Sequence, residues 1–172
     1  MKQIFFLRVL VISCVLIFLG VFNSHANNSD DALEQMEIKG LTFDTMVQSP
    51  IVILTDKKQN VILPIWIGIC EARSIELGLS DVVAPRPLTY DLIAAVIRTM
   101  NAKVERIVIV DLRDEVFYAQ VELSVDGKVS KIDARPSDAI ALASRMSSPI
   151  FVKKTVLKKA ALLDSDQEKR RL

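Results

Sequence analysis

Histidine and cysteine are nearly absent from this sequence. Of 172 residues one is histidine, His25, and two are cysteines, Cys14 and Cys70. His25 and Cys14 lie in an N-terminal segment that we expect to be removed, so the mature chain has no histidine and a single cysteine. This composition excludes Ser-His-Asp and Cys-His nucleophilic catalysis, histidine general bases and histidine metal ligands. A hydrolase of this composition must use carboxylates, hydroxyls, lysine or arginine, most simply with a bound divalent cation.

The N-terminal segment has the features of a signal peptide. Lys2 and Arg8 give it a positive start, an apolar run covers 9–22, and Ser24 and Ala26 supply the small residues that a signal peptidase recognises. We therefore predict a signal peptide over 1–26 and a periplasmic or secreted protein without stable membrane insertion after cleavage. The alternative is an uncleaved N-terminal membrane anchor, because 4–22 approaches the ~20 residues that span a bilayer.

The mature chain has almost no net charge. Lys2 and Arg8 leave with the signal peptide, so 20 basic side chains face 21 acidic ones. Cys70 has no partner for an internal disulfide, so the stability of an exported domain must come from its core. We expect Cys70 to be buried and poorly reactive, because no histidine is present to activate it. A chain of about 146 residues is long enough for one domain with one core.

Hydrophobic periodicity predicts an α+β fold in a single domain. Grouped hairpins favour a largely antiparallel or mixed sheet with helices over a doubly wound parallel one. Strands are predicted over 36–43, 51–54, 61–67, 104–112, 116–125, 128–135 and 149–153, and helices over 69–80, 89–100, 136–146 and 156–163. The domain then covers 34–163, between a flexible lead over 27–33 and a charged tail over 164–172. Glu71-Ala72 and Asp138-Ala139 both follow a hairpin at a helix start, which indicates a duplicated β-hairpin–helix unit.

The segment Ile132–Leu142 carries the strongest local signal for a site. A strand that ends at Arg135 meets a helix that starts with Pro136, Ser137 and Asp138. Asp133, Arg135 and Asp138 therefore lie at one corner beside a helix N-terminus, which favours anions. Two interpretations remain open: a site for a metal and a phosphate, or a structural ion pair with a helix cap.

Seven short segments resemble, in the same order, the motifs of the bifunctional nuclease domain family. The resemblance covers nearly the whole mature chain, from about Met36 to Leu157. The segments are Leu63–Gly68, Glu71-Ala72, Pro85–Thr89, Asp111–Asp114, Phe117–Ala119, Ile132–Leu142 and Pro149–Val152.

The resemblance implies an exported nuclease that acts on phosphodiester bonds of DNA, RNA or both. Its acidic and basic motif positions are then the candidate site residues. Carboxylates would bind Mg²⁺ or Mn²⁺, which activates water, and arginines would bind phosphate. The candidates are Glu71, Asp133 and Asp138 for catalysis, Arg86, Arg113 and Arg135 for the substrate, and Asp111, Asp114, Asp133 and Asp138 for the metal.

The alternative is a non-catalytic binding or assembly domain of the same fold. The near-neutral charge and the missing histidine favour it, and Tyr90 stands where relatives often carry histidine, which leaves activity open. Asp and Arg in 111–114 are also common turn formers and surface ion pairs. The four lysines at 153, 154, 158 and 159 form either a solvated helix face or a nucleic-acid contact. We predict a nucleic-acid partner and leave a homo-oligomer open.

Overall fold

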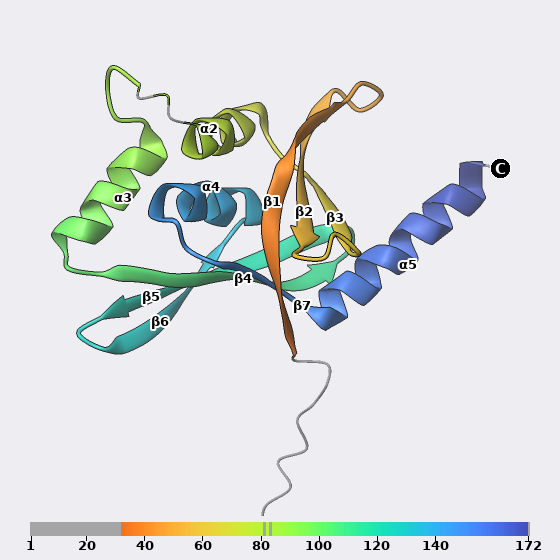
Figure 1. Ribbon diagram of the computed structural model, residues 1–172. Helices are drawn as coiled ribbons and strands as arrows, with labels where there is room; N and C mark the ends of the chain where they lie inside the picture. The colour runs from red at the N-terminus through yellow and green to blue at the C-terminus, as the bar shows by residue number, and fades with distance from the viewer. Residues whose placement is uncertain (1–31, 81, 83, 172) are drawn as a thin grey trace, which may run out of the picture.

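The computed structural model describes residues 32–80, 82 and 84–171 (Figure 1). The predicted signal peptide and most of the predicted lead lie outside these residues. The order of strands and helices agrees with the prediction, and the single α+β domain is confirmed. The strands are β1 (Leu33–Asp44), β2 (Ser49–Asp56), β3 (Ile62–Trp66), β4 (Lys103–Arg113), β5 (Val116–Val125), β6 (Lys128–Ala134) and β7 (Ile150–Lys153). The helices are α2 (Ile69–Leu79), α3 (Thr89–Thr99), α4 (Pro136–Met146) and α5 (Lys154–Arg171).

The seven strands form one open sheet in the order β3-β2-β1-β7-β4-β5-β6. Every neighbouring pair is antiparallel except β4 and β7, which run parallel. The predicted largely antiparallel, mixed sheet is therefore confirmed. Two three-stranded units, β1–β3 and β4–β6, meet only through the short strand β7, where Met36 and Ile107 both pair with Ile150.

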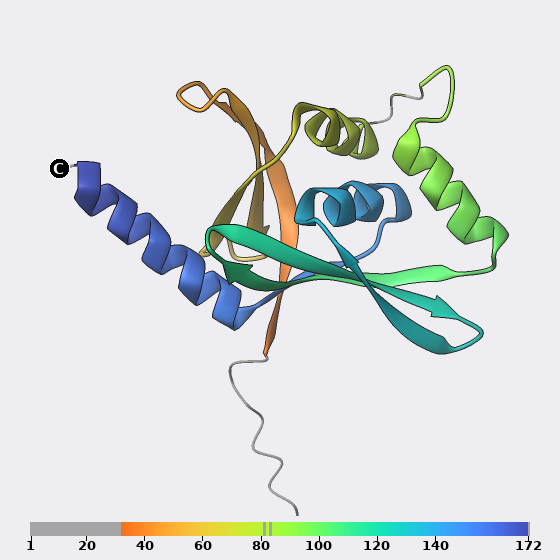
Figure 2. The same ribbon diagram turned by 180° about the vertical axis from the view of Figure 1, so that it is seen from behind.

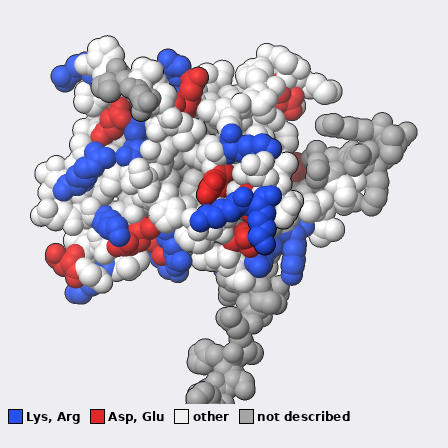
Figure 3. Space-filling view, in the orientation of Figure 1, with Lys and Arg blue, Asp and Glu red and all other residues white. Residues whose placement is uncertain are grey.

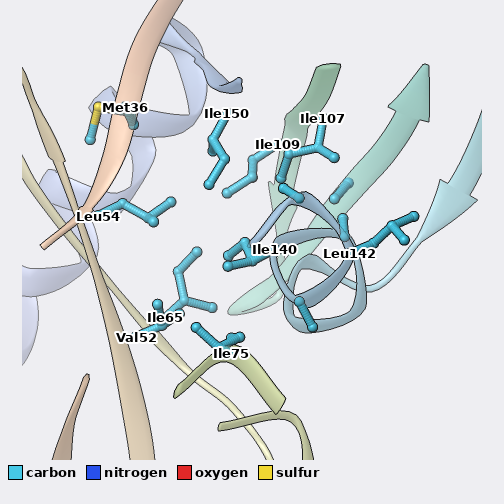
Figure 4. Packing of buried hydrophobic residues seen from close by; sticks show 14 of the residues in the cluster. Met36, Val52, Leu54, Ile65, Ile75, Ile107, Ile109, Ile140, Leu142 and Ile150 are labelled. Carbon is cyan, nitrogen blue, oxygen red and sulfur yellow. The ribbon is translucent and has the colours of Figure 1, made fainter. Parts of the chain in front are cut away.

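Three helices lie on one side of the sheet in two layers. Figures 1 and 2 show α4 next to the strands, with α2 and α3 outside it. Because α4 is covered from both sides, it is apolar around most of its circumference, and every residue from Ala139 to Ala143 is buried. Its Ile140 lies among side chains from both sheet units and from α2, including Leu54, Ile75 and Ile109 (Figure 4). The core therefore holds the N-terminal ends of α2 and α4 in fixed positions.

Helix α5 is longer than the predicted helix over 156–163. It starts directly after β7, at Lys154, and continues to Arg171. The sequence has neither glycine nor proline after Pro149, so nothing in it interrupts the helix. None of the helices in the described part of the chain is both long enough and apolar enough to span a membrane.

The prediction that Cys70 is buried is wrong, because Cys70 is exposed. Ile69, Ala72, Ile75 and Leu79 recur at helical spacing and so share one face of α2. Only Ile75 is fully buried, whereas Ile69 and Leu79 are 69% and 53% exposed. The helix contacts the core through Ile75 near its middle, whereas Ile69 and Leu79 at its two ends turn outward. Its first two residues, Ile69 and Cys70, therefore face solvent.

Candidate active site

Two equivalent acidic residues from the two halves of the chain bind the same arginine. Glu71 is the third residue of α2 and Asp138 the third residue of α4, and each helix follows a hairpin. Arg135, just before α4, donates from Nε to Asp138 Oδ2 at 2.6 Å and from Nη2 to Oδ1 at 2.8 Å. The same Nη2 donates to Glu71 Oε1 at 2.8 Å. The guanidinium thus joins the N-terminal ends of both helices.

Helix α3 adds a hydroxyl to this group. Tyr90, which is 9% exposed, donates its hydroxyl hydrogen to Asp138 Oδ1 at 2.5 Å. Burial and the neighbouring Asp138 carboxylate raise the pKa of Tyr90 well above its ordinary value, so the phenol stays protonated. We call Glu71, Tyr90, Arg135 and Asp138 the Arg135 cluster. The sequence did not place Tyr90 in it, because the two positions lie 48 residues apart.

The electrostatics of the cluster keep Asp138 and Arg135 ionised. Burial opposes the charge of Asp138, but the bonds from Arg135 and Tyr90 outweigh it, and the pKa of Asp138 lies below its ordinary value. The hydrogen bonds to Asp138 and, to a smaller extent, to Glu71 raise the pKa of Arg135. The Arg135 side chain is 67% exposed, against 31% for Asp138 and 16% for Glu71. Within the described residues its Nη1 has no hydrogen-bond partner, so the cluster presents one fixed, cationic N–H edge to solvent.

Gly68 leaves room for the Glu71 carboxylate. A Cβ atom on residue 68 would clash with Glu71 Oε2, so a side chain there would push this carboxylate away from its position against Arg135. Residue 68 is the N-cap of α2, and its extended backbone would itself accept other residues. Glycine at position 68 therefore provides space for the Glu71 carboxylate, and the backbone conformation does not require it. The motif that ends in Gly68 and the Glu71 motif thus belong to one structural feature.

The second predicted acidic region is an ion-pair group that fastens α5 to β4. Asp111 accepts from Lys159 Nζ at 2.8 Å and from Arg113 Nε at 2.5 Å. The bond from Lys159 has the largest effect and the bond from Arg113 the next largest, and together they lower the pKa of Asp111 far below its ordinary value. The Arg113 guanidinium also lies 4.9 Å from the centre of the Tyr118 ring. Neither Asp111 nor Arg113 bonds to the Arg135 cluster.

Three further candidates stand apart from the cluster. Asp114 and Glu115 form the β4–β5 turn, with φ of 47° and 63°. Asp133 is exposed on β6 and points away from the face that Ala134 shares with the buried Ala119. Arg86 is exposed in the loop before α3. Among the described residues none of these three predicted side chains, Asp114, Asp133 and Arg86, forms a hydrogen bond or ion pair with the cluster.

The described residues do not form a preformed cation site. No group of three or more His, Cys, Asp or Glu side chains in this part of the chain could hold a metal ion. The four predicted ligands lie on β4, in the β4–β5 turn, on β6 and on α4. The two carboxylates that do converge, Glu71 and Asp138, are both bound by Arg135. The geometry thus favours an arginine-based anion site over a carboxylate-based cation site.

Arg145 links the three helices around the cluster, and the sequence did not single it out. Its side chain is only 9% exposed, and its Nε donates to Asp91 Oδ1 of α3 at 2.6 Å. Its Nη1 donates to the Ser74 carbonyl of α2. A Cβ atom on Gly78 would overlap Ser144 and the Arg145 guanidinium, so α2 approaches α4 closely here. An arginine in a last helical turn is common, and no local pattern marks this one as buried.

Acid should weaken this fold. Asp138 and Asp111 have folded-state pKa values below the ordinary ones. Such groups stabilise the fold above their unfolded pKa, near 4, and that contribution is lost as pH falls through the folded pKa. We expect a nearly constant Tm around neutral pH and a fall that begins near pH 4. Asp138→Asn should reduce the fall in calorimetric scans, and an equal Tm at pH 3 and pH 7 would contradict the assignment.

The surface around these groups has mixed charge. Figure 3 shows lysine and arginine side chains next to aspartate and glutamate across the visible face, without one large area of a single sign. Arg106, for instance, pairs with Glu122, which also lies 3.7 Å from Lys131. An anionic ligand would therefore be held by local contacts such as the free edge of Arg135 more than by a broad positive field.

Comparison with known proteins places this arrangement in a family. The bifunctional nuclease domain model matches residues 52–165, which include the whole Arg135 cluster and Arg145. This chain belongs to the bifunctional nuclease domain family. The predicted resemblance is thereby confirmed.

The relatives of this family member come from bacteria and plants. The uncharacterized protein Rv1829 of Mycobacterium tuberculosis is 38% identical over 137 residues, which cover 78% of this chain and 82% of that protein. Bifunctional nuclease 1 of Arabidopsis thaliana is 29% identical over 107 residues, or 60% of this chain and 33% of the plant protein. Bifunctional nuclease 1 of Oryza sativa subsp. japonica is 24% identical over 116 residues, which cover 66% of this chain and 35% of the rice protein. The plant relatives thus match over about a third of their length.

Proposed function

We propose that this protein is an exported nuclease that binds a phosphodiester of DNA or RNA at the Arg135 cluster. The observation that carries the proposal is the orientation of Arg135. Asp138 and Glu71 hold its Nε and Nη2, and Nη1 remains directed to solvent on a 67% exposed side chain. A guanidinium whose geometry is fixed in advance is well suited to bind phosphate oxygens. The names of the plant relatives support the nuclease assignment.

The cluster contains the groups that hydrolysis of a phosphodiester needs. Arg135 would bind the non-bridging oxygens and stabilise the charge that grows on them in the transition state. Glu71 would accept a proton from the attacking water as the new P–O bond forms. The bond to the leaving sugar oxygen breaks, and solvent supplies the proton that this oxygen takes up. Tyr90 and Asp138 would position Arg135 and keep its charge in place.

The cation predicted from the sequence stays a prediction. The described residues do not fit a preformed site for Mg²⁺ or Mn²⁺, so the steps above use only side chains of this chain. We expect the protein to bind single-stranded nucleic acid equally well in EDTA and in Mg²⁺, because the phosphate contact comes from Arg135. Fluorescence anisotropy with a labelled oligonucleotide measures this, and binding that disappears in EDTA would show that a cation takes part in the contact.

Binding without cleavage is the second candidate function. Arg135 already neutralises both converging carboxylates, and the lowered pKa of Asp138 makes that group a weak base. The same cluster would then bind phosphate in a nucleic-acid-binding or assembly domain. Degradation assays on single- and double-stranded DNA and RNA, with and without Mg²⁺ or Mn²⁺, separate the two. Binding with no degradation under any condition favours the second function.

Asp138→Asn should lower cleavage by about ten- to a hundredfold and leave the protein folded. The amide keeps the size of Asp138, but it no longer holds the Arg135 guanidinium by charge. Losses of this size are typical when a group that orients an active side chain is removed. Asp126→Asn is the matched control, since Asp126 is exposed in the β5–β6 turn and its φ of 48° suits asparagine.

The variants Glu71→Gln and Asp133→Asn complete this test. We expect Glu71→Gln to reduce the rate of cleavage more than the affinity, because it removes the proposed base. Asp133→Asn tests the predicted catalytic role of a side chain that makes no bond to the cluster. Equal cleavage by Asp138→Asn, Asp126→Asn and the parent protein would exclude the Arg135 cluster as the active site.

We propose that the protein acts in the periplasm or outside the cell. The support is the signal-peptide pattern of residues 1–26, which lies outside the described residues. N-terminal sequencing of the protein from the cell envelope should give a mature start at Asn27. An intact N-terminus at Met1 in the membrane fraction would instead favour the N-terminal anchor.

A further inference from the structure

The face of α3 that points away from α4 is unusual because it carries no charge. The helix has two charged residues, and both turn toward Arg145: Asp91 accepts from its Nε at 2.6 Å, and Arg98 donates to its carbonyl at 3.2 Å. Leu92 is 60% exposed, Val96 49% and Met100 63%. Leu88 is 38% exposed and Ile93 39%. A solvated helix face normally carries charged or polar residues, so this face is suited to contact another apolar surface.

The apolar residues repeat at intervals of four and form a stripe. Leu88, Leu92, Val96 and Met100 occupy neighbouring turns on the side of α3 that faces away from its neighbour α4. Figures 1 and 2 show α3 at the outer edge of the helix layers, with no other element beyond it. We call these four residues the α3 stripe. The rest of the exposed face consists of small or hydroxyl side chains, such as Ala95 and Thr99, which let another helix approach closely.

We propose that the α3 stripe is the interface of a homodimer in which two copies of α3 pack antiparallel about a two-fold axis. The spacing of the stripe is symmetric about Ala94. An antiparallel pair centred there places Leu92 against Val96 of the second copy and Leu88 against Met100, so every apolar residue meets another. A two-fold interface requires this self-complementarity, which an unrelated partner does not. The absence of charge on the stripe also offers a charged partner nothing to pair with.

A hollow beside the stripe fits the same arrangement. It has a volume of about 360 Å³ and is lined by Leu77, Ala84, Pro87 and Leu88, with Asp91 and Arg145 at its polar side. In the antiparallel pair, Met100 of the second copy lies over Leu88 and next to this hollow. A flexible, unbranched side chain fills an irregular hollow readily. A specific interface buries about 1,000 Å² or more, and stripe and hollow together would supply the apolar centre of such an interface.

Sedimentation equilibrium of protein from the full expressed chain, at about 1 to 100 µM, tests the proposal. We expect a dimer, and we expect Leu92→Glu and Val96→Glu each to give the monomer mass, because each variant would bury a charge from both copies in the apolar interface. Leu162→Glu is the matched control: Leu162 is 66% exposed on α5, so the same change should leave the dimer intact. A monomer at every concentration, or a dimer that survives Leu92→Glu and Val96→Glu, overturns the proposal.

The orientation of the helices has its own test. In a Cys70→Ser background, chains with Leu92→Cys are mixed with chains with Val96→Cys and oxidised. The antiparallel pair predicts that disulfide-linked heterodimers outnumber both homodimers. Equal or preferred linkage between two Leu92→Cys chains would overturn the antiparallel arrangement. Because α3 also carries Tyr90, the dimer would help to hold that hydroxyl against Asp138.

Discussion

Arg135→Lys should reduce cleavage of nucleic acid by at least about a hundredfold and weaken binding, while the protein stays folded. The lysine keeps one positive charge between Glu71 and Asp138, so neither carboxylate loses its counter-charge. It cannot form the two bonds to Asp138 and the bond to Glu71 at once, nor present a further fixed N–H edge to phosphate. The change therefore separates the charge of Arg135 from its geometry.

The control for this variant is Arg73→Lys. Arg73 lies on α2, is 65% exposed, and pairs with Glu76 only one turn away on the same helix. It matches Arg135 in exposure and chemistry but not in position. Cleavage rates and anisotropy should change in Arg135→Lys alone. Full activity in both variants would mean that the guanidinium of Arg135 is not required, and the proposed phosphate contact would be wrong.

Arg145→Met should lower the free energy of unfolding by on the order of 3 kcal/mol. Methionine fills much of the same space, but the carbonyl of Ser74 and the carboxylate of Asp91 lose their donor. Asp91 is partly exposed and recovers some solvation, which places the loss at the low end for a buried ion pair. A loss of this size corresponds to a drop in Tm of roughly 6–12 °C for a chain of this length.

Arg98→Met gives the matched comparison for Arg145. Arg98 is exposed on α3 and makes one side-chain bond, to the Arg145 carbonyl. We expect Arg98→Met to cost less than about 1 kcal/mol, because an exposed donor and acceptor are solvated when the bond is lost. Urea unfolding followed by circular dichroism measures both variants. Equal stability of the two would show that Arg145 does not hold α2 and α3 on α4.

The order of elements could be predicted because each one carries its own periodicity. Alternation along Val116–Val125, the Asp126-Gly127 turn and Pro136 at a helix start act over a few residues, and the local backbone follows them. The exposure of Cys70 could not be predicted in the same way. Helical periodicity gives the face of α2 that could be buried, and only the position of α4 determines which turns of that face are covered.

The contacts of the candidate site also fall into two groups, those that local sequence predicts and those that depend on the packing of distant segments. Arg135 and Asp138 are three residues apart, so their pairing follows from the strand-to-helix corner alone. The bonds from Tyr90 and to Glu71 span 48 and 64 residues and depend on how α2 and α3 pack on α4. The bonds of Arg145 to Asp91 and Ser74 also join residues that are far apart in the sequence. Asp111 forms ion pairs with Arg113 and Lys159, and the second of these links β4 to α5. No local sequence pattern distinguishes an aspartate with this structural role from one that binds a ligand.

Strand β7 affects the way in which the chain can fold. It has four residues, lies at the centre of the sheet, and comes almost last in the sequence. The β1–β3 hairpins can form early, since they pair neighbours along the chain, but Met36 must wait for Ile150. Contacts so distant in sequence carry a large loop-closure cost and slow the search for the native state. The nascent polypeptide therefore has two unconnected half-sheets, each with an open edge, until β7 has left the ribosome.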